Sequence, residues 1–201
     1  MKSVIHYFNL DLGSPEKNDE FFKSLHNLIT ILFAVVFGVG LQKYGSIPTL
    51  TTDQYLFLSL VFIVILQSWW GYHLGIIKGP DERNEICYFI DVLLLVLYWF
   101  MIECFRDVNF LLLLFTIMFL LYFLWELIRY LNPSTNEQYK KVVKKAMIAN
   151  LIFTIFFSLI TLAYFLILTP NYRPTPLILI IILLGLFIGY RMLISNIYKQ
   201  R

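Results

Sequence analysis

Six long apolar stretches, separated by short polar segments, restrict what this chain of 201 residues can fold into. The hydrocarbon core of a bilayer is about 30 Å thick, and a helix needs roughly 20 apolar residues to cross it. The stretches that approach this length are residues 25–41, 54–77, 86–105, 109–131, 146–168 and 175–195. Their apolar residues are continuous and lack the alternation expected of membrane β-strands. The sequence therefore predicts an all-α polytopic membrane protein with six transmembrane helices.

The composition supports this fold class and excludes others. Hydrophobic residues make up 59% of the chain and charged residues 14%, against about 45–50% and about 25% in soluble domains. Too few polar residues are present to cover a water-exposed surface, which excludes a soluble enzyme. The basic residues are scattered between apolar runs rather than gathered on one face, so we expect the lipid bilayer as a partner and no nucleic acid.

One transmembrane domain accounts for most of the chain. We assign it to residues 25–195, preceded by a cytoplasmic segment at 1–24 and followed by a short cytoplasmic tail at 196–201. Ser14, Pro15 and Glu16 resemble an N-cap followed by proline at the first helical position, so the first helix should begin before its apolar part. The longest expected connection is a polar loop at 132–145, which carries Lys140, Lys141, Lys144 and Lys145.

The distribution of basic residues predicts the orientation. With six crossings, 13 of the 16 Lys and Arg residues fall on the side that holds both termini, and the other side has Lys43, Arg106 and Arg173. Cytoplasmic loops are the ones enriched in Lys and Arg. We therefore expect both termini in the cytoplasm of a protein of the bacterial inner (plasma) membrane.

Polar residues inside the predicted helices gather in the cytoplasmic third. This polar layer comprises His26, Asn27, Gln67, His73, Asp91, Glu126, Arg129, Asn150 and Arg191. Ionisable residues within membrane helices are costly unless paired or hydrated, which makes them candidates for a functional site. The layer is either an ion path or a network that fixes helix packing.

Two pairs within the layer can be predicted from their spacing. His73 and Asp91 flank a short loop at similar depth; they form a functional ion-sensing pair, a packing hydrogen bond, or no contact. Glu126 and Arg129 are spaced i,i+3 on one helix face and could form an intrahelical ion pair. Arg129 and Arg191 are also long enough to reach the cytoplasmic headgroups.

Two helices contain pairs of glycines at a spacing that favours close packing, and the chain lacks common enzyme and metal-binding motifs. Gly71 with Gly75, and Gly185 with Gly189, have the G-x-x-x-G spacing that allows close helix packing or oligomerisation. No H-E-x-x-H, G-x-x-x-x-G-K or G-x-S-x-G motif occurs, and there is no metal-ligand cluster. We therefore expect neither an enzyme nor a bound metal or cofactor.

Part of the chain resembles a known family. Residues 55–95, with Trp-Gly-Tyr-His at 70–73 and Asp-Glu-Arg at 81–83, resemble the second and third helices of the prokaryotic endolysosomal potassium channels. That resemblance implies a multimeric, cation-selective pore lined by the first helix. At the family's Phe-Ser-Asp position this chain has Ser24, Leu25, His26 and Asn27. The alternative is a separate bacterial six-helix family.

Two functions are compatible with these features. The first is an ion-conducting pore, with a homo-oligomer that passes a monovalent cation through the polar layer to an apolar gate. The second is a non-transporting membrane module of a multi-gene bacterial system, for stress response or phage defence. In that case the basic segment 132–145 would dock a cytoplasmic or membrane protein partner.

Overall fold

The computed structural model describes residues 15–46, 50–78, 85–132, 137–167 and 175–199, which form helices and no strand. The elements are α2 (Pro15–Ser46), α3 (Thr52–Lys78), α4 (Glu85–Cys104), α5 (Val108–Leu131), α6 (Glu137–Leu162), the π-helical turn η2 (Ala163–Ile167) and α7 (Pro176–Lys199). The predicted all-α fold with six long helices is confirmed.

Each of the six helices is long and apolar enough to cross a membrane. Their outward faces carry large hydrophobic side chains, among them Leu166, Ile181 and Leu159, with 74%, 61% and 59% of their surface exposed. Exposed apolar faces of this size on long helices are typical of proteins that span a membrane. The chain is an integral membrane protein.

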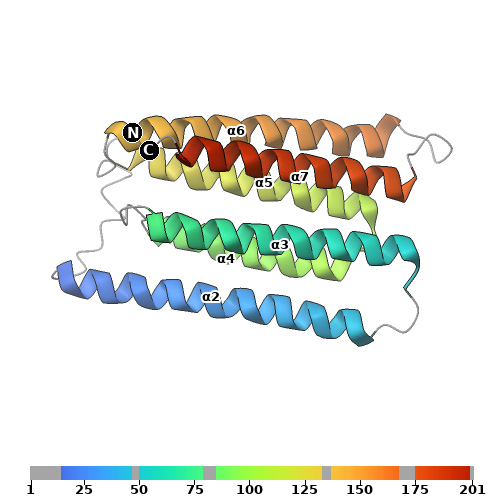
Figure 1. The fold of residues 1–201 in the computed structure, drawn as a ribbon, viewed down its shortest axis with the longest axis horizontal. Coiled ribbons are helices and arrows are strands. Elements are labelled where there is room, and N and C mark those ends of the chain that lie inside the picture. The colour runs from blue at the N-terminus through green and yellow to red at the C-terminus, as the bar shows by residue number, and fades with distance from the viewer. Residues whose placement is uncertain (1–14, 47–49, 79–84, 133–136, 168–174, 200–201) are drawn as a thin grey trace.

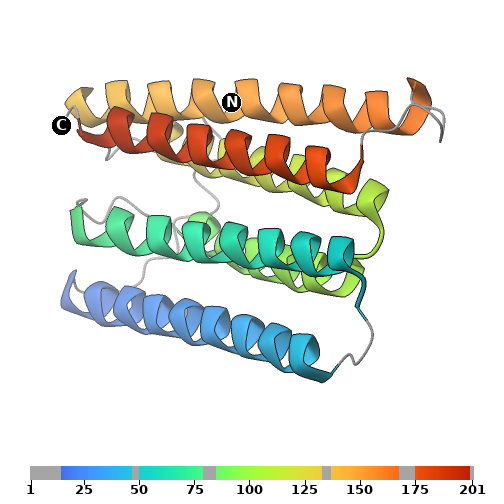
Figure 2. The same ribbon diagram turned by 45° about the vertical axis from the view of Figure 1, so that its right-hand side comes forward.

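α2 lies on one side of the bundle, α3 and α4 lie in the middle, and α5, α6 and α7 lie on the other side (Figures 1 and 2). We call α2, α3 and α4 the N-terminal half and α5, α6 and α7 the C-terminal half. The halves meet where α4 packs against α5 and α3 packs against α7. A short turn joins α4 to α5, and there Asp107 caps α5 by accepting a hydrogen bond from the Phe110 amide at 3.1 Å.

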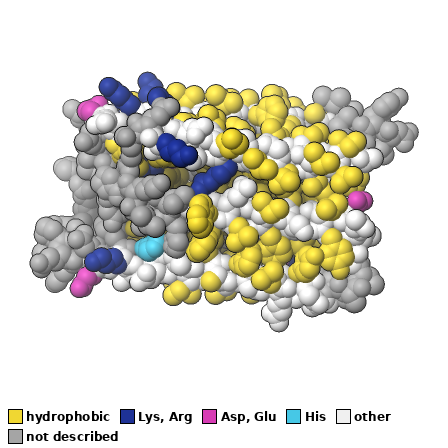
Figure 3. Space-filling model, in the orientation of Figure 1, with side chains coloured by type: hydrophobic (Ala, Val, Ile, Leu, Met, Phe, Trp, Pro, Cys, Tyr) yellow, Lys and Arg dark blue, Asp and Glu magenta, His cyan; other side chains and the backbone are white. Residues whose placement is uncertain are grey.

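Both ends of the described chain lie at the same end of the bundle, as six crossings require (Figure 1). On the face drawn in Figure 3, Lys and Arg side chains gather over the left half, while hydrophobic side chains cover most of the right half. We call this the basic end. That it faces the cytoplasm stays a prediction.

The helix boundaries confirm one expectation and correct two. α2 begins at Pro15, as the proline predicted, so residues 15–24 are helical. α7 continues to Lys199, so most of the predicted tail at 196–201 is helix. The segment 132–145 is not one loop, because α6 begins at Glu137 and includes its four lysines. Tyr139, Val142, Val143 and Ala146 pack against Ile194 and Ile197 of α7, and this amphipathic packing stabilises helix beyond the apolar stretch.

An aromatic cluster closes the middle of the C-terminal half. The ring centroids of Phe119 and Phe157 lie 4.8 Å apart, and those of Phe115 and Phe187 lie 5.0 Å apart. All four side chains are at most 2% exposed. Such contacts fill the bundle beyond the polar layer, so this part of the interior is apolar and closed. At the opposite end of the bundle, Lys43 of α2 forms an ion pair with Glu103 of α4.

Candidate functional site: a polar cavity between the two halves

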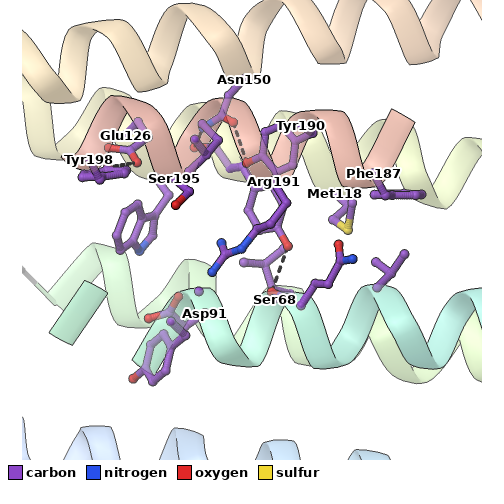
Figure 4. A pocket seen from close by; sticks show the side chains of 18 of the residues that line it. Ser68, Asp91, Met118, Glu126, Asn150, Phe187, Tyr190, Arg191, Ser195 and Tyr198 are labelled. Carbon is purple, nitrogen blue, oxygen red and sulfur yellow. Dashed lines mark hydrogen bonds between the residues drawn. The ribbon is translucent and has the colours of Figure 1, made fainter. Parts of the chain in front are cut away.

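A cavity of about 240 Å³ lies between the N-terminal and C-terminal halves (Figure 4). Residues of all six helices line it, which places it inside the bundle. It brings together six of the nine residues of the predicted polar layer, namely Gln67, Asp91, Glu126, Arg129, Asn150 and Arg191. Residues far apart in the chain thus meet around one space.

The cavity is polar toward the basic end and apolar toward the middle of the bundle. Tyr139 and Lys199, in the first and last turns of their helices, line its outer part. Its inner part is lined by Phe33, Val64, Leu94, Met118 and Phe187, which we call the apolar floor. The space therefore runs inward from the basic end and stops at the floor.

Glu126 and Arg129 form the predicted intrahelical ion pair. Nη1 of Arg129 donates to Oε2 of Glu126 at 3.3 Å, and both side chains are buried. Tyr198 of α7 donates to Oε1 of Glu126 at 2.5 Å and accepts from Nη1 of Arg129 at 3.2 Å. The guanidinium also lies over the rings of Trp125 and Tyr139, at 4.3 and 5.0 Å from their centroids. These contacts connect α5, α6 and α7.

Three hydroxyl groups link the two halves beside the cavity. The hydroxyls of Ser68 and Tyr98 lie 2.5 Å apart, and each lies 2.8 Å from the hydroxyl of Tyr122. Ser68 and Tyr122 line the cavity, while Tyr98 is fully buried behind them. We call these residues the hydroxyl trio. It joins α3 and α4 of one half to α5 of the other.

Asn150 is buried and connects three helices of the C-terminal half. Its Nδ2 donates to the Tyr122 carbonyl of α5 at 3.3 Å, and its Oδ1 accepts from the Tyr190 hydroxyl of α7 at 2.8 Å. An amide that uses both of its ends in this way is held in one orientation. Asn150 therefore takes part in the packing of these three helices, and it also lines the cavity.

Arg191 extends from α7 into the cavity (Figure 4). A Cβ placed on Gly71 would lie 2.5 Å from its Nη1, so the guanidinium rests against the backbone of α3. Among the described residues it makes no hydrogen bond and no ion pair, in contrast to Arg129. The long side chain thus points inward instead of reaching the headgroups.

Asp91 is 5% exposed and also lines the cavity. The side chain of His73 lies outside the described residues, so the predicted contact between His73 and Asp91 stays a prediction. His26 does not line the cavity, but its Nδ1 lies 3.3 Å from the hydroxyl of Tyr72, which does. Asn27 is exposed and belongs to neither group. Of the nine residues of the polar layer, six line the cavity, His26 and Asn27 do not, and the side chain of His73 is not among those described.

The four predicted packing glycines differ from one another. Gly71 lines the cavity and makes room for Arg191. Among the described residues, nothing lies within 4 Å of a Cβ placed on Gly185 or Gly189, so they do not bring helices of this chain together. The surroundings of Gly75 lie outside the described residues.

Sequence reasoning missed the tyrosines of the site, because tyrosines in membrane helices are most often interfacial anchors. Tyr122, Trp125, Glu126 and Arg129 follow the spacing i, i+3, i+4, i+7 of one helix face, and all four line the cavity. From this spacing alone, Tyr122 could have been predicted to lie on the same helix face as Glu126 and Arg129. Within the described ranges, no three His, Cys, Asp or Glu side chains are grouped to hold a metal.

No protein family model, curated protein or solved structure matches this chain. The resemblance to the endolysosomal potassium channels therefore rests on residues 55–95 of the sequence and stays a prediction.

Proposed function

We propose that this membrane protein is an ion-conducting pore whose path enters through the cavity between the two halves. The observation that carries the proposal is a space lined by polar and charged side chains inside a bundle of membrane-spanning helices. Such side chains are rare in membrane interiors and generally mark ion or solute pathways.

The apolar floor supports a gated pore rather than an open one. Met118 and Phe187 are at most 2% exposed, and the aromatic cluster lies against Phe187. Hydrophobic constrictions of this kind block ions by excluding water. Conduction would then require the two halves to move apart at the floor.

The charges around the cavity bear on the kind of ion. Glu126 is neutralised by Arg129, which leaves Asp91 against the positive charges of Arg191 and Lys199. This balance supports an anion more than the monovalent cation expected from the sequence. The resemblance implied a pore lined by the first helix of several copies, whereas one copy of this chain encloses the cavity, to which α2 contributes Phe33. A homo-oligomer is therefore compatible with the proposal but not required by it.

Reconstitution into sealed liposomes tests the proposal. Purified protein should dissipate an imposed gradient of Cl⁻, benzoate, K⁺, Na⁺ or H⁺ faster than protein-free liposomes, and the set of gradients identifies the ion. Permeation of benzoate is measured at a pH well above the pKa of benzoic acid, because the neutral acid crosses a bilayer without a protein and its fraction is small at that pH. If every gradient decays at the protein-free rate, the proposed function is wrong.

A second candidate function is a membrane module that docks a protein partner. The observation in its favour is that Lys141, Lys144 and Lys145 are exposed at the start of α6, at the basic end. Replacement of these three lysines by glutamine should then abolish cross-linking to an acidic protein partner in native membranes while leaving ion flux unchanged. Loss of flux without loss of cross-linking would favour the pore.

A further inference from the structure

Arg191 makes no hydrogen bond and no ion pair with a described residue, although Asp91 lines the same cavity. Arg191 lies eight residues before Lys199, the last residue of α7, which corresponds to about 12 Å along the helix axis. A guanidinium at such a depth is unfavourable unless it meets water, a carboxylate or a ligand. Of the two carboxylates that line the cavity, Glu126 is already bonded to Arg129 and Tyr198, and no ion pair joins Asp91 to Arg191.

The surroundings of the guanidinium resemble a binding site more than a packing contact. Gly71 has no side chain, and this leaves the space against α3 that the guanidinium occupies. Ser195 and Lys199 follow Arg191 one and two turns nearer the basic end and line the same cavity. Deeper in, Met118 and Phe187 supply an apolar surface. The cavity therefore has a cationic part that extends from Lys199 at its outer end to Arg191, and an apolar part at its floor.

From this arrangement we propose that the cavity binds a small carboxylate with an apolar body, held by the guanidinium of Arg191. The planar guanidinium donates two parallel hydrogen bonds that match the two oxygens of a carboxylate. The apolar body would lie against the floor. This inference rests on the proposed function, because it assigns a class of substrate to the cavity through which the proposed pore is entered.

The volume of the cavity and the charges that line it restrict the class of ligand further. The cavity volume of about 240 Å³ is just below the range of about 300–1,000 Å³ that holds drug-sized ligands, so the carboxylate must be small. Lys199 at the outer part adds a positive potential that attracts an anion from solution. A quaternary or simple cation would meet the positive charges of Arg191 and Lys199, which outnumber the single carboxylate of Asp91 once Glu126 is paired with Arg129.

Isothermal titration of the full-length protein in detergent tests the inference, with benzoate as the probe. The wild type should bind benzoate, and benzamide, the neutral analogue of the same shape, should bind at least tenfold more weakly. Arg191→Gln should weaken benzoate binding at least tenfold, and Arg191→Lys should weaken it less, because it keeps the charge but loses the paired donors. Lys144→Gln, which removes an exposed charge on α6, is the matched control and should bind like the wild type.

Three results would overturn the inference: no benzoate binding to the wild type, equal affinity for benzoate and benzamide, or unchanged affinity in Arg191→Gln. Binding of phosphatidylglycerol in mixed micelles in place of benzoate would also overturn it, because the site would then belong to a lipid headgroup. The benzamide comparison needs no substitution and so stands even if Arg191→Gln does not fold. Since the titration involves no gradient, binding without flux would contradict the proposed pore alone, and flux without binding would contradict the carboxylate site alone.

Discussion

Glu126 and Arg129 show how a charged pair persists inside a membrane bundle. Each is at most 6% exposed, and the pair is completed by the hydroxyl of Tyr198 and the faces of two aromatic rings. A buried ion pair requires further hydrogen bonds to offset its desolvation. Removal of either partner would leave the other charge buried and unpaired, and this would destabilise the protein more than the intact pair stabilises it.

Substitution of Glu126 by Gln should destabilise the protein by about 3 kcal/mol, because it leaves the guanidinium of Arg129 buried without its counter-charge. Reversible unfolding in mixed detergent micelles measures the change. Glu137→Gln is the matched control, since Glu137 pairs with Lys140 but 85% of its side chain is exposed. Glu137→Gln should lower the free energy of unfolding by less than about 1 kcal/mol. Equal effects of the two substitutions would contradict the structural role of Glu126.

Gly71→Ala should weaken benzoate binding with little loss of stability. The added Cβ would lie 2.5 Å from Nη1 of Arg191, and the flexible end of that side chain can move away, which displaces the guanidinium from its place. Gly185→Ala meets open space among the described residues and should leave binding unchanged. Titration of both variants checks the prediction, and a Gly71→Ala variant that binds like the wild type would argue against the observed position of Arg191.

At the scale of the elements, hydropathy predicted the helices but not their ends or faces. The apolar stretch of the fifth helix led us to expect its start near Ala146, whereas α6 starts at Glu137 because Tyr139 and Val142 pack against α7. Depth along a helix follows from sequence position, and six of the nine residues of the predicted polar layer line one cavity. The direction in which each side chain points depends on the neighbouring helices, and so the roles of Gly71 and Tyr122 required the structure.

The position of α6 in the C-terminal half depends on Asn150. Asn150→Ala would remove hydrogen bonds to α5 and α7 and leave the Tyr190 hydroxyl without its acceptor. Such bonds contribute about 0.6 kcal/mol each and at most about 1.7 kcal/mol in membrane proteins, so we expect a loss of about 1–3 kcal/mol on unfolding in micelles. Asn196→Ala, at an exposed position of α7, is the control and should change stability by less than about 0.5 kcal/mol.

For the whole molecule, the arrangement of the helices determines where ions could pass. The two halves touch along α4 with α5 and along α3 with α7, and the cavity lies between these contacts. Of the fold, the number, order and approximate extent of the crossings could be predicted from the chain. The way in which the two halves pack together could not, because it depends on interhelical contacts such as those of the hydroxyl trio, whose members are separated by up to 54 residues.

Phe187→Ala should open the floor and increase ion flux in liposomes. Phe187 is 2% exposed, lines the cavity and packs against Phe115 and Phe119, so its removal connects the cavity with space now filled by aromatic rings. Water that enters an apolar constriction lowers its barrier to ions, and we expect flux to rise about tenfold or more.

The matched control for Phe187→Ala is Phe156→Ala, which removes the same side chain from an exposed position on α6. Gel filtration of both variants separates a specific opening of the floor from a general loss of folding. If the barrier lies at the floor, folded Phe187→Ala protein conducts more than the wild type, whereas Phe156→Ala does not. Equal flux in the wild type and the two folded variants would mean that ions, if they cross at all, do not pass through this cavity.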